Sequence, residues 1–240
     1  MNPLFLLTAF FAEVAGTLAG FGSSTIALPI ALFFFDFQTA LVLVAFLHIF
    51  GNIGRIGFFK HGLDRRLILF FGVPSVAASL AGALLISFIP QDVLKGLLGV
   101  FLLVYSGLSL WKDTLRIPAS HVNAGIGGVL SGFLAGLIGT GGALRGAFLT
   151  AFDLKKEKYI ATAAAVALAV DLTRIPVYLR QGFLPEAHYP AVAILFVIAI
   201  LGSWLGRLIV DRISQALFRK IVLLALLFVG IFFTSTWLEN

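Results

Sequence analysis

Long apolar runs separated by short polar breaks are the feature that most constrains the fold of this chain. Several runs are long enough for a helix to cross a ~30 Å hydrocarbon core, which takes about 20 residues. Only 12% of the 240 residues are charged, against roughly 25% in ordinary soluble domains. Because so little polar surface is available, we expect an all-α integral membrane protein. Its apolar segments lie at about 3–19, 24–35, 38–59, 67–89, 93–111, 121–138, 142–152, 158–179, 187–210 and 215–237.

Composition argues against several other classes. The chain has no Cys, so neither disulfides nor thiolate metal sites can form. The four His residues are scattered and show no ligand spacing, so no metal or cofactor is expected. The net charge of +6 comes from basic residues in short loops, which suits membrane orientation rather than nucleic-acid binding. The apolar start of the chain has no basic region or small-residue cleavage site, so we expect it to form the first helix.

The chain contains an internal duplication. Gly22 and Gly139 begin similar small-residue stretches 117 positions apart, and Asp36 and Asp153 follow a Phe at the same offset. Further matches at slowly increasing offsets are Asn52 to Ile56 with Asp171 to Ile175, Gly82 with Gly202, and Gly107 with Gly230. We expect a first membrane repeat over 1–111, a connecting loop over 112–120 and a second repeat over 121–240.

Each repeat opens with two segments that we expect to be short. Segment 24–35 covers about 18 Å as a helix, and 142–152 covers less. Neither is long enough to cross a ~30 Å core. We interpret each opening pair as a hairpin that enters the membrane, turns at a glycine-rich tip near the middle and leaves on the same side. Non-helical backbone at that depth requires burial in protein or a watery cavity.

Three full crossings then follow in each repeat, and because three is odd the second repeat is inverted. The loops on one side would carry twelve of the 17 basic residues, and the opposite side would carry Lys95 and Arg180. This bias predicts a cytoplasmic basic side, with both termini outside a cell (plasma or inner) membrane. The twelve are Lys60, Arg65, Arg66, Lys112, Arg116, Lys155, Lys156, Lys158, Arg207, Arg212, Arg219 and Lys220.

The two glycine-rich tips are candidate anion-binding elements, because each precedes a short helix. A helix N-terminus offers unpaired N–H groups and a positive dipole end, and Ser and Thr hydroxyls add donors. Two such ends meeting at mid-membrane would form an anion site of the kind that broken helices build in transporters. The alternative is tight glycine packing, with Ser and Thr only capping helices. The residues concerned are Gly22, Ser23, Ser24, Thr25, Thr140, Gly141 and Gly142.

Arg145 lies about one turn past the second tip, between Leu144 and Gly146. An Arg at the centre of a membrane helix costs about 2.5–3.5 kcal/mol on insertion scales, so it usually meets an anion or a carboxylate. Its planar guanidinium fits a sulfonate or carboxylate in bidentate geometry. We predict contact with the substrate; the alternative is a structural ion pair with Glu13, the only acid in the first hairpin.

Two repeat-related polar pairs, Asn52 with Arg55 and Asp171 with Arg174, each share one helix face. They would place positive charge on either side of a central site and act in gating or coupling. The alternative is that Arg55 extends toward the interface and that Asp171 and Arg174 form an internal ion pair. His48, one turn before Asn52, is either a neutral core residue or part of a proton relay.

These residues resemble the TauE/SafE family, the sulfite exporters and related anion permeases, over essentially the whole chain. The stretch from Gly20 to Pro29 is similar to the family's glycine-rich motif ending in Pro, and Gly136 to Gly142 to its counterpart. The chain departs from the pattern at Ser23 and Ser24, where Gly is usual, and at Arg145-Gly146, where a second Pro is expected. The resemblance implies export of sulfite, sulfonates such as sulfoacetate or related small anions, with protons as the coupling ion.

Two other functions stay open at this level. The same positive lining would serve an anion channel. Ser23 or Ser24 with His48 could form an intramembrane serine dyad, although no acid in the sequence is identified that would orient the histidine. The identity of the anion and the oligomeric state are left open.

Overall fold

A computed structural model describes residues 2–20, 22–59, 62–111, 117–212 and 214–239, and every regular element in these ranges is helical. The predicted all-α class is confirmed. The basic residues Lys60, Lys112 and Arg116 lie outside the described residues. The α-helices are α1 (Pro3–Ala19), α2 (Ser24–Ala31), α3 (Phe37–Phe58), α4 (Arg65–Leu67), α5 (Val73–Leu85), α6 (Gln91–Trp111), α7 (His121–Ile138), α8 (Gly142–Leu149), α9 (Lys156–Arg180), α10 (Tyr189–Ile209) and α11 (Gln215–Leu238).

Seven helices among the described residues are long and apolar enough to cross a membrane. Two of them are composite: α4, a π-helical turn, α5 and a final 3-10 turn form one run over Arg65–Phe88, and a 3-10 turn precedes α10 in Glu186–Ile209. The protein is therefore a multi-pass membrane protein. The expectation that both opening segments of each repeat are short is wrong for the second repeat, because α7 has 18 residues and is long enough for a span. By contrast α1 is shorter, and α2 and α8 have eight residues each.

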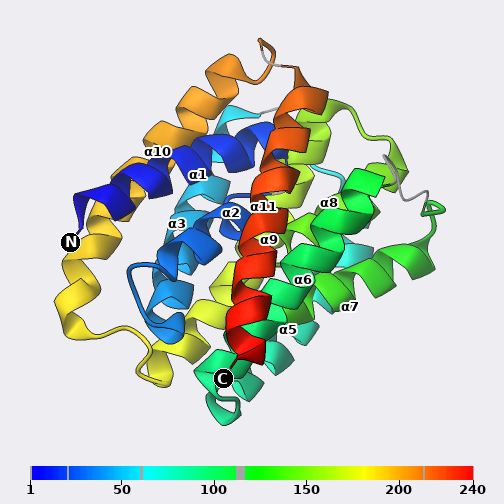
Figure 1. Cartoon of the computed structure of the whole chain (residues 1–240). Coiled ribbons are helices and arrows are strands. Elements are labelled where there is room, and N and C mark those ends of the chain that lie inside the picture. The colour runs from blue at the N-terminus through cyan, green and yellow to red at the C-terminus, as the bar shows by residue number, and fades with distance from the viewer. Residues whose placement is uncertain (1, 21, 60–61, 112–116, 213, 240) are drawn as a thin grey trace.

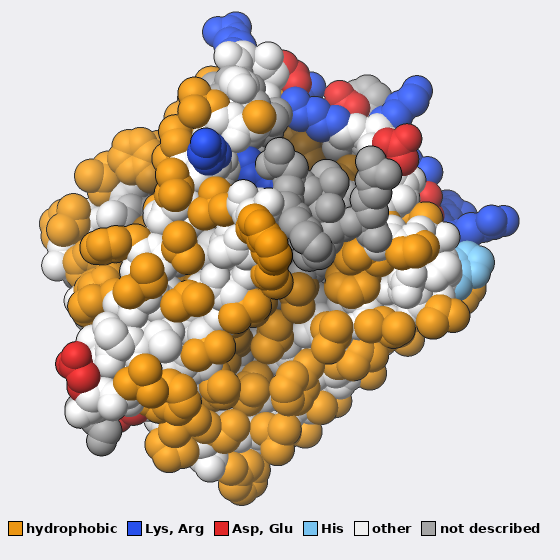
Figure 2. Space-filling model, turned by 45° about the vertical axis from the view of Figure 1, so that its right-hand side comes forward, with side chains coloured by type: hydrophobic (Ala, Val, Ile, Leu, Met, Phe, Trp, Pro, Cys, Tyr) orange, Lys and Arg blue, Asp and Glu red, His pale blue; other side chains and the backbone are white. Residues whose placement is uncertain are grey.

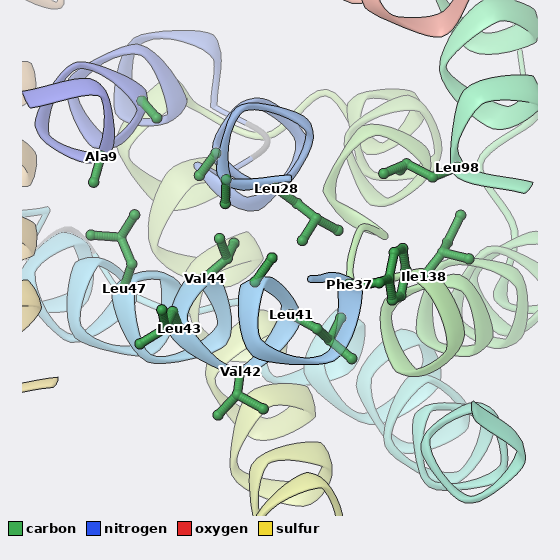
Figure 3. Packing of buried hydrophobic residues seen from close by; sticks show 14 of the residues in the cluster. Ala9, Leu28, Phe37, Leu41, Val42, Leu43, Val44, Leu47, Leu98 and Ile138 are labelled. Atoms are coloured by element: carbon green, nitrogen blue, oxygen red, sulfur yellow. The ribbon is translucent and has the colours of Figure 1, made fainter. Parts of the chain in front are cut away.

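The centre of the molecule is formed by α3 and α9, which pack against each other. In the most apolar 18-residue stretch of each helix, 67% of the residues are buried in α3 and 61% in α9. The corresponding share is 28% in the outer helices α10 and α11. Leu41, Leu43 and Leu47 of α3 are part of the main hydrophobic cluster, which also contains Leu28 of α2 and Ile138 of α7 (Figure 3). The first hairpin thus packs on α3 through α2, and the second meets α3 at its tip, where Gly139 lies against Leu41.

The chain reverses direction at two glycine-rich turns. Gly20 ends α1 with φ 75° and Gly139 ends α7 with φ 73°, a left-handed conformation that glycine adopts without a steric penalty. After each turn a short helix packs back on the preceding one, α2 on α1 and α8 on α7. The glycine-rich stretches therefore act as the predicted hairpin tips.

Each hairpin lies mainly against a helix from the other half of the chain. Helix α1 packs on α10, and α7 packs on α5, whereas α6 pairs with α11 (Figure 1). The close approach requires small residues. A Cβ on Gly82 of α5 would lie 2.5 Å from the Phe133 carbonyl oxygen of α7, and one on Gly202 of α10 would lie 2.9 Å from Glu13 Cβ of α1.

Hydrophobic side chains cover most of the face shown in Figure 2, and Lys and Arg gather at one end. At this end three connecting segments are tied together by ion pairs. Lys158 lies 3.0 Å from Asp64, and Lys156 lies 2.7 Å from Asp211. Three of the four segments predicted to share one side of the membrane are therefore neighbours in space.

Candidate functional site

The two hairpin tips meet in the interior of the protein. The hydroxyl oxygens of Thr25, in the first turn of α2, and Thr140, just before α8, are 2.7 Å apart and hydrogen-bonded. Both side chains are fully buried, as are those of Ser23 and Ser24. Gly22, Gly141 and Gly142 are buried as well. The two tips thus meet through Thr25 and Thr140, and all seven tip residues singled out in the sequence are buried.

Ser23 does not behave as a helix cap. It occupies the residue before α2, but its side chain makes no capping hydrogen bond. Its Oγ is buried without a hydrogen-bond partner among the described residues. The interpretation that this serine serves only to cap the helix is wrong.

Arg145 is the buried cation of the second hairpin. Its side chain is 3% exposed, and it forms no ion pair or hydrogen bond with the residues that the structure describes. Its Nε atom in particular is buried without a partner. The alternative of an ion pair with Glu13 is wrong, because Glu13 pairs with Arg55 instead.

Arg145 lines a small cavity of about 10 Å³, the space of roughly one water molecule. The wall is formed by the first tip, by the polar face of α3 and by small residues of α9. Its lining residues are Gly20, Gly22, Asn52, Arg55, Arg145, Ile160, Ala163 and Ala164. Two arginines from the two halves of the chain therefore line the same small space.

Arg55 is held in place by the first hairpin. It forms an ion pair with Glu13 of α1, and its Nε donates a hydrogen bond of 3.0 Å to Thr17 Oγ1. Gly51 makes room for the carboxylate, since a Cβ there would overlap Glu13 Oε1. Arg55 is 3% exposed, so the alternative that it extends to the interface is wrong.

Asp171 and Arg174 form an internal ion pair, which is the alternative given for them in the sequence. Asp171 Oδ1 accepts from Arg174 Nε at 2.9 Å and lies 2.8 Å from Arg174 Nη2. Arg174 Nη1 also donates to the Ala135 carbonyl near the end of α7 at 2.5 Å. Arg174 thereby links α9 to the second hairpin, as Arg55 links α3 to the first.

His48 and Asn52 join the two ion pairs. His48 Nδ1 lies 2.8 Å from Asp171 Oδ2, and the Asn52 side-chain carbonyl accepts from Arg55 Nη1 at 2.7 Å while its amide faces Asp171 at 3.4 Å. The absence of an orienting acid for His48, inferred from the sequence, is therefore wrong. Its other nitrogen, Nε2, faces the Gly22 backbone, where an added Cβ would lie 2.5 Å away.

The buried charges do not balance. Arg55, Arg145 and Arg174 stand against the carboxylates of Glu13 and Asp171, all at most 3% exposed. With a neutral His48, the described interior carries one positive charge in excess, and Arg145 is the cation without a partner. A buried charge is normally paired, so this arrangement is suited to an anion.

Sequence reasoning missed the roles of Glu13, Thr17 and Tyr178. Tyr178, one turn after Arg174, donates a 2.5 Å hydrogen bond to the Gly136 carbonyl. Glu13 as the sole acid of the first hairpin was a usable signal, but its spacing cannot tell which arginine it meets. No group of three His, Cys, Asp or Glu suited to a metal ion occurs in the part of the chain that the structure covers.

Comparison with known proteins agrees with the resemblance found in the glycine-rich stretches. The family model described as sulfite exporter TauE/SafE matches residues 5–233. A curated relative, a probable membrane transporter protein of Methanocaldococcus jannaschii, is 26% identical over 255 residues, covering 96% of this chain and 94% of the relative. The chain therefore belongs to the TauE/SafE sulfite exporter family of membrane transporters.

Proposed function

We propose that this protein is a secondary transporter that exports small sulfur-containing or organic anions, such as sulfite and sulfonates like sulfoacetate. The observation that carries the proposal is Arg145, a buried guanidinium without a partner among the described residues, which faces a cavity shared with Arg55 and Asn52. An oxyanion at this position would accept hydrogen bonds from the planar guanidinium. The N–H groups at the starts of α2 and α8 would add further donors.

The size of the cavity favours alternating access over a channel. A space for one water molecule cannot hold a multi-atom oxyanion, so the hairpins and α9 must move apart to admit it. A carrier needs no continuous pore, because its central site opens to one side at a time, whereas an open channel requires one.

An inverted repeat would explain how the site opens on alternate sides. Each hairpin packs on a helix from the other repeat, α1 on α10 and α7 on α5. Two inverted copies of one unit would produce this arrangement. The repeat-related glycines Gly82 and Gly202 serve these two equivalent contacts. The basic end would face the cytoplasm, with both termini outside.

Proton coupling fits the buried polar network. His48 and Asp171 share a hydrogen bond beside the cavity, and Asn52 relays their charge state to Arg55. Protonation of this pair would change the positive charge that the anion meets. We therefore assign His48, Asn52, Arg55, Asp171 and Arg174 to coupling or gating.

Transport into proteoliposomes tests this function. Labelled sulfite uptake should saturate, should be driven by a pH gradient and should be accelerated by unlabelled substrate on the opposite side. Thermal-shift measurements with sulfite, sulfonates, thiosulfate and carboxylates rank the substrates, because a ligand stabilises the state it binds. Flux that neither saturates nor responds to substrate on the opposite side would show a channel.

The serine-enzyme alternative has one structural argument in its favour, the His48–Asp171 hydrogen bond. However, neither Ser23 nor Ser24 is hydrogen-bonded to His48 within the described residues, where His48 Nε2 has no partner. Labelling of the purified protein by a fluorophosphonate probe, lost in Ser23→Ala, would support an enzyme instead.

A further inference from the structure

Helices α6 and α11 form an antiparallel pair that is tight at one end and open at the other. Near the start of α6, a Cβ on Gly96 would lie 2.3 Å from Trp237 Cδ2, and one on Gly99 would lie 2.8 Å from the Thr234 nitrogen. Near the end of α6, by contrast, a Cβ on Gly107 would meet nothing within 4 Å. The two helices therefore separate toward the end of the molecule where basic residues gather.

The open end contains a basic cleft of about 620 Å³ between α6 and α11. Arg219 and Lys220 line it together with Ser109 and Leu217. In the described part of the chain, neither cation forms an ion pair or hydrogen bond. Both lie near the N-terminus of α11, where the helix dipole disfavours positive charge. The cleft is thus suited to an anionic group.

A second, apolar cleft of about 330 Å³ continues from the same point. It is lined by residues of α6 and α8 and shares Ser109 with the basic cleft. Val100, Val104 and Leu108 line it on α6, and Leu144 and Ala147 line it on α8. An apolar groove that ends at two unpaired cations matches an acyl chain joined to an anionic headgroup.

The opposite end of the α6–α11 pair provides an internal comparison. A cleft of about 400 Å³ lies there too, but its cation Lys95 is 3.2 Å from Asp92, which lines the same cleft. Only the end with Arg219 and Lys220 combines unpaired positive charge with a continuous apolar groove among the described clefts.

We propose that this site binds an anionic phospholipid of the leaflet on the basic side, with its acyl chain along α6 and its phosphate near Arg219 and Lys220. Anionic lipid surfaces attract cations at this depth. The acyl chain would pack on Leu144 and Ala147, the neighbours of Arg145 in α8, and would stabilise the hairpin that carries it. That last consequence rests on the proposed role of Arg145, whereas lipid binding does not.

Native mass spectrometry of the delipidated protein titrated with phosphatidylglycerol or phosphatidylcholine tests the site. We expect tighter binding of phosphatidylglycerol, and a loss of about 30-fold for the double variant Arg219→Gln/Lys220→Gln, at about fivefold per cation. The matched control is Arg65→Gln/Arg66→Gln, an adjacent exposed pair at the start of α4, which should leave the preference unchanged. Val104→Trp, which fills the apolar groove, should weaken both lipids.

Three results would overturn the proposal: equal binding of the two lipids, an unchanged preference in the α11 double variant, or an equal loss in the control. If the α11 variant instead weakens sulfite binding in lipid-free detergent and keeps its lipid preference, the basic cleft serves the substrate. None of these measurements depends on transport, so their failure is separable from failure of the proposed function.

Discussion

The hydroxyl oxygens of Thr25 and Thr140 lie 2.7 Å apart although the residues are 115 positions apart in the chain. Each belongs to a different hairpin, and each lies where a short helix begins. Because both hydroxyls are fully buried, the hydrogen bond fixes the relative position of the two helix N-termini. It directly links the two hairpin tips of the candidate anion site.

Removing this hydrogen bond should show coupling between the two hairpins. Thr25→Val leaves the Thr140 hydroxyl buried without a partner, which typically costs about 1–3 kcal/mol. The double variant Thr25→Val/Thr140→Val should cost clearly less than the sum of the single variants, as measured by unfolding in detergent. Thr173→Val is the control, since its hydroxyl bonds Ala169 of its own helix. Strictly additive effects would argue against the contact.

Arg145→Ala should separate binding from folding. Since Arg145 forms no ion pair with the described residues, its removal should not lower the unfolding temperature of the substrate-free protein. Substrate affinity should fall about 10- to 150-fold, the equivalent of about 1.5–3 kcal/mol for one charge-assisted partner. Calorimetric titration with sulfite and thermal unfolding measure the two effects.

Two further variants sharpen the test of Arg145. Arg145→Lys should also bind poorly, because an ammonium group cannot present the planar fork of donors. Arg180→Ala, at the exposed end of α9, should bind and transport like the wild type. Wild-type transport by Arg145→Ala would show that Arg145 is not a substrate ligand.

Breaking the ion pair between Glu13 and Arg55 should damage the fold itself. Glu13→Gln leaves a buried guanidinium uncompensated, which typically costs about 3–5 kcal/mol. The double variant Glu13→Gln/Arg55→Gln should recover part of this stability, as followed by gel filtration and thermal unfolding. Lys95→Gln breaks an exposed ion pair and should cost at most about 1 kcal/mol. A fully stable Glu13→Gln protein would contradict the assignment of Arg55 as the partner.

Asp64 should give the connecting loop a pH-dependent contribution to stability. The Leu67 backbone N–H hydrogen-bonds to its carboxylate and Lys158 lies beside it, so its pKa is lowered from the usual range. A lowered pKa means that the stabilisation is present above the unfolded-state pKa of about 3.9 and is lost as the pH falls through the lower folded-state value. Asp64→Asn keeps a capping side chain but lacks this titration. The difference in unfolding temperature between wild type and Asp64→Asn should therefore shrink below about pH 4. A difference that does not depend on pH would contradict the contribution assigned to the Asp64 carboxylate.

The orientation can be tested with single cysteines, because the natural chain has none. Glu157 begins α9 at the basic end, and Glu186 follows the other end of that helix. In intact cells, an impermeant maleimide should label Glu186→Cys but not Glu157→Cys, and both should react after permeabilisation. Labelling of Glu157→Cys alone from outside would show that the orientation is the opposite of the one proposed.

The sequence by itself determined the class of protein and the approximate limits of its helices. A segment in lipid must satisfy its backbone hydrogen bonds internally and needs about 20 apolar residues to cross, so the observed bounds differ from the apolar runs mainly at helix ends. The tips were also predictable, because Gly20 and Gly139 adopt a left-handed conformation that favours glycine. The ion pair of Asp171 with Arg174 was available as an alternative because residues three apart share a helix face.

Only the tertiary structure decided which buried charges meet across helices. Glu13 could have served Arg145 or Arg55, and the packing of α1 beside α3, with Gly51 at the contact, selected Arg55. In the same way, the acidic partner of His48 is Asp171, which lies 123 positions away on α9. Hydrophobic periodicity specifies which residues are buried, but the rotation and separation of packed helices determine their partners. Arg145 has no ion-pair partner among the described residues. This unpaired buried charge, rather than the mere presence of an arginine, marks the candidate anion site.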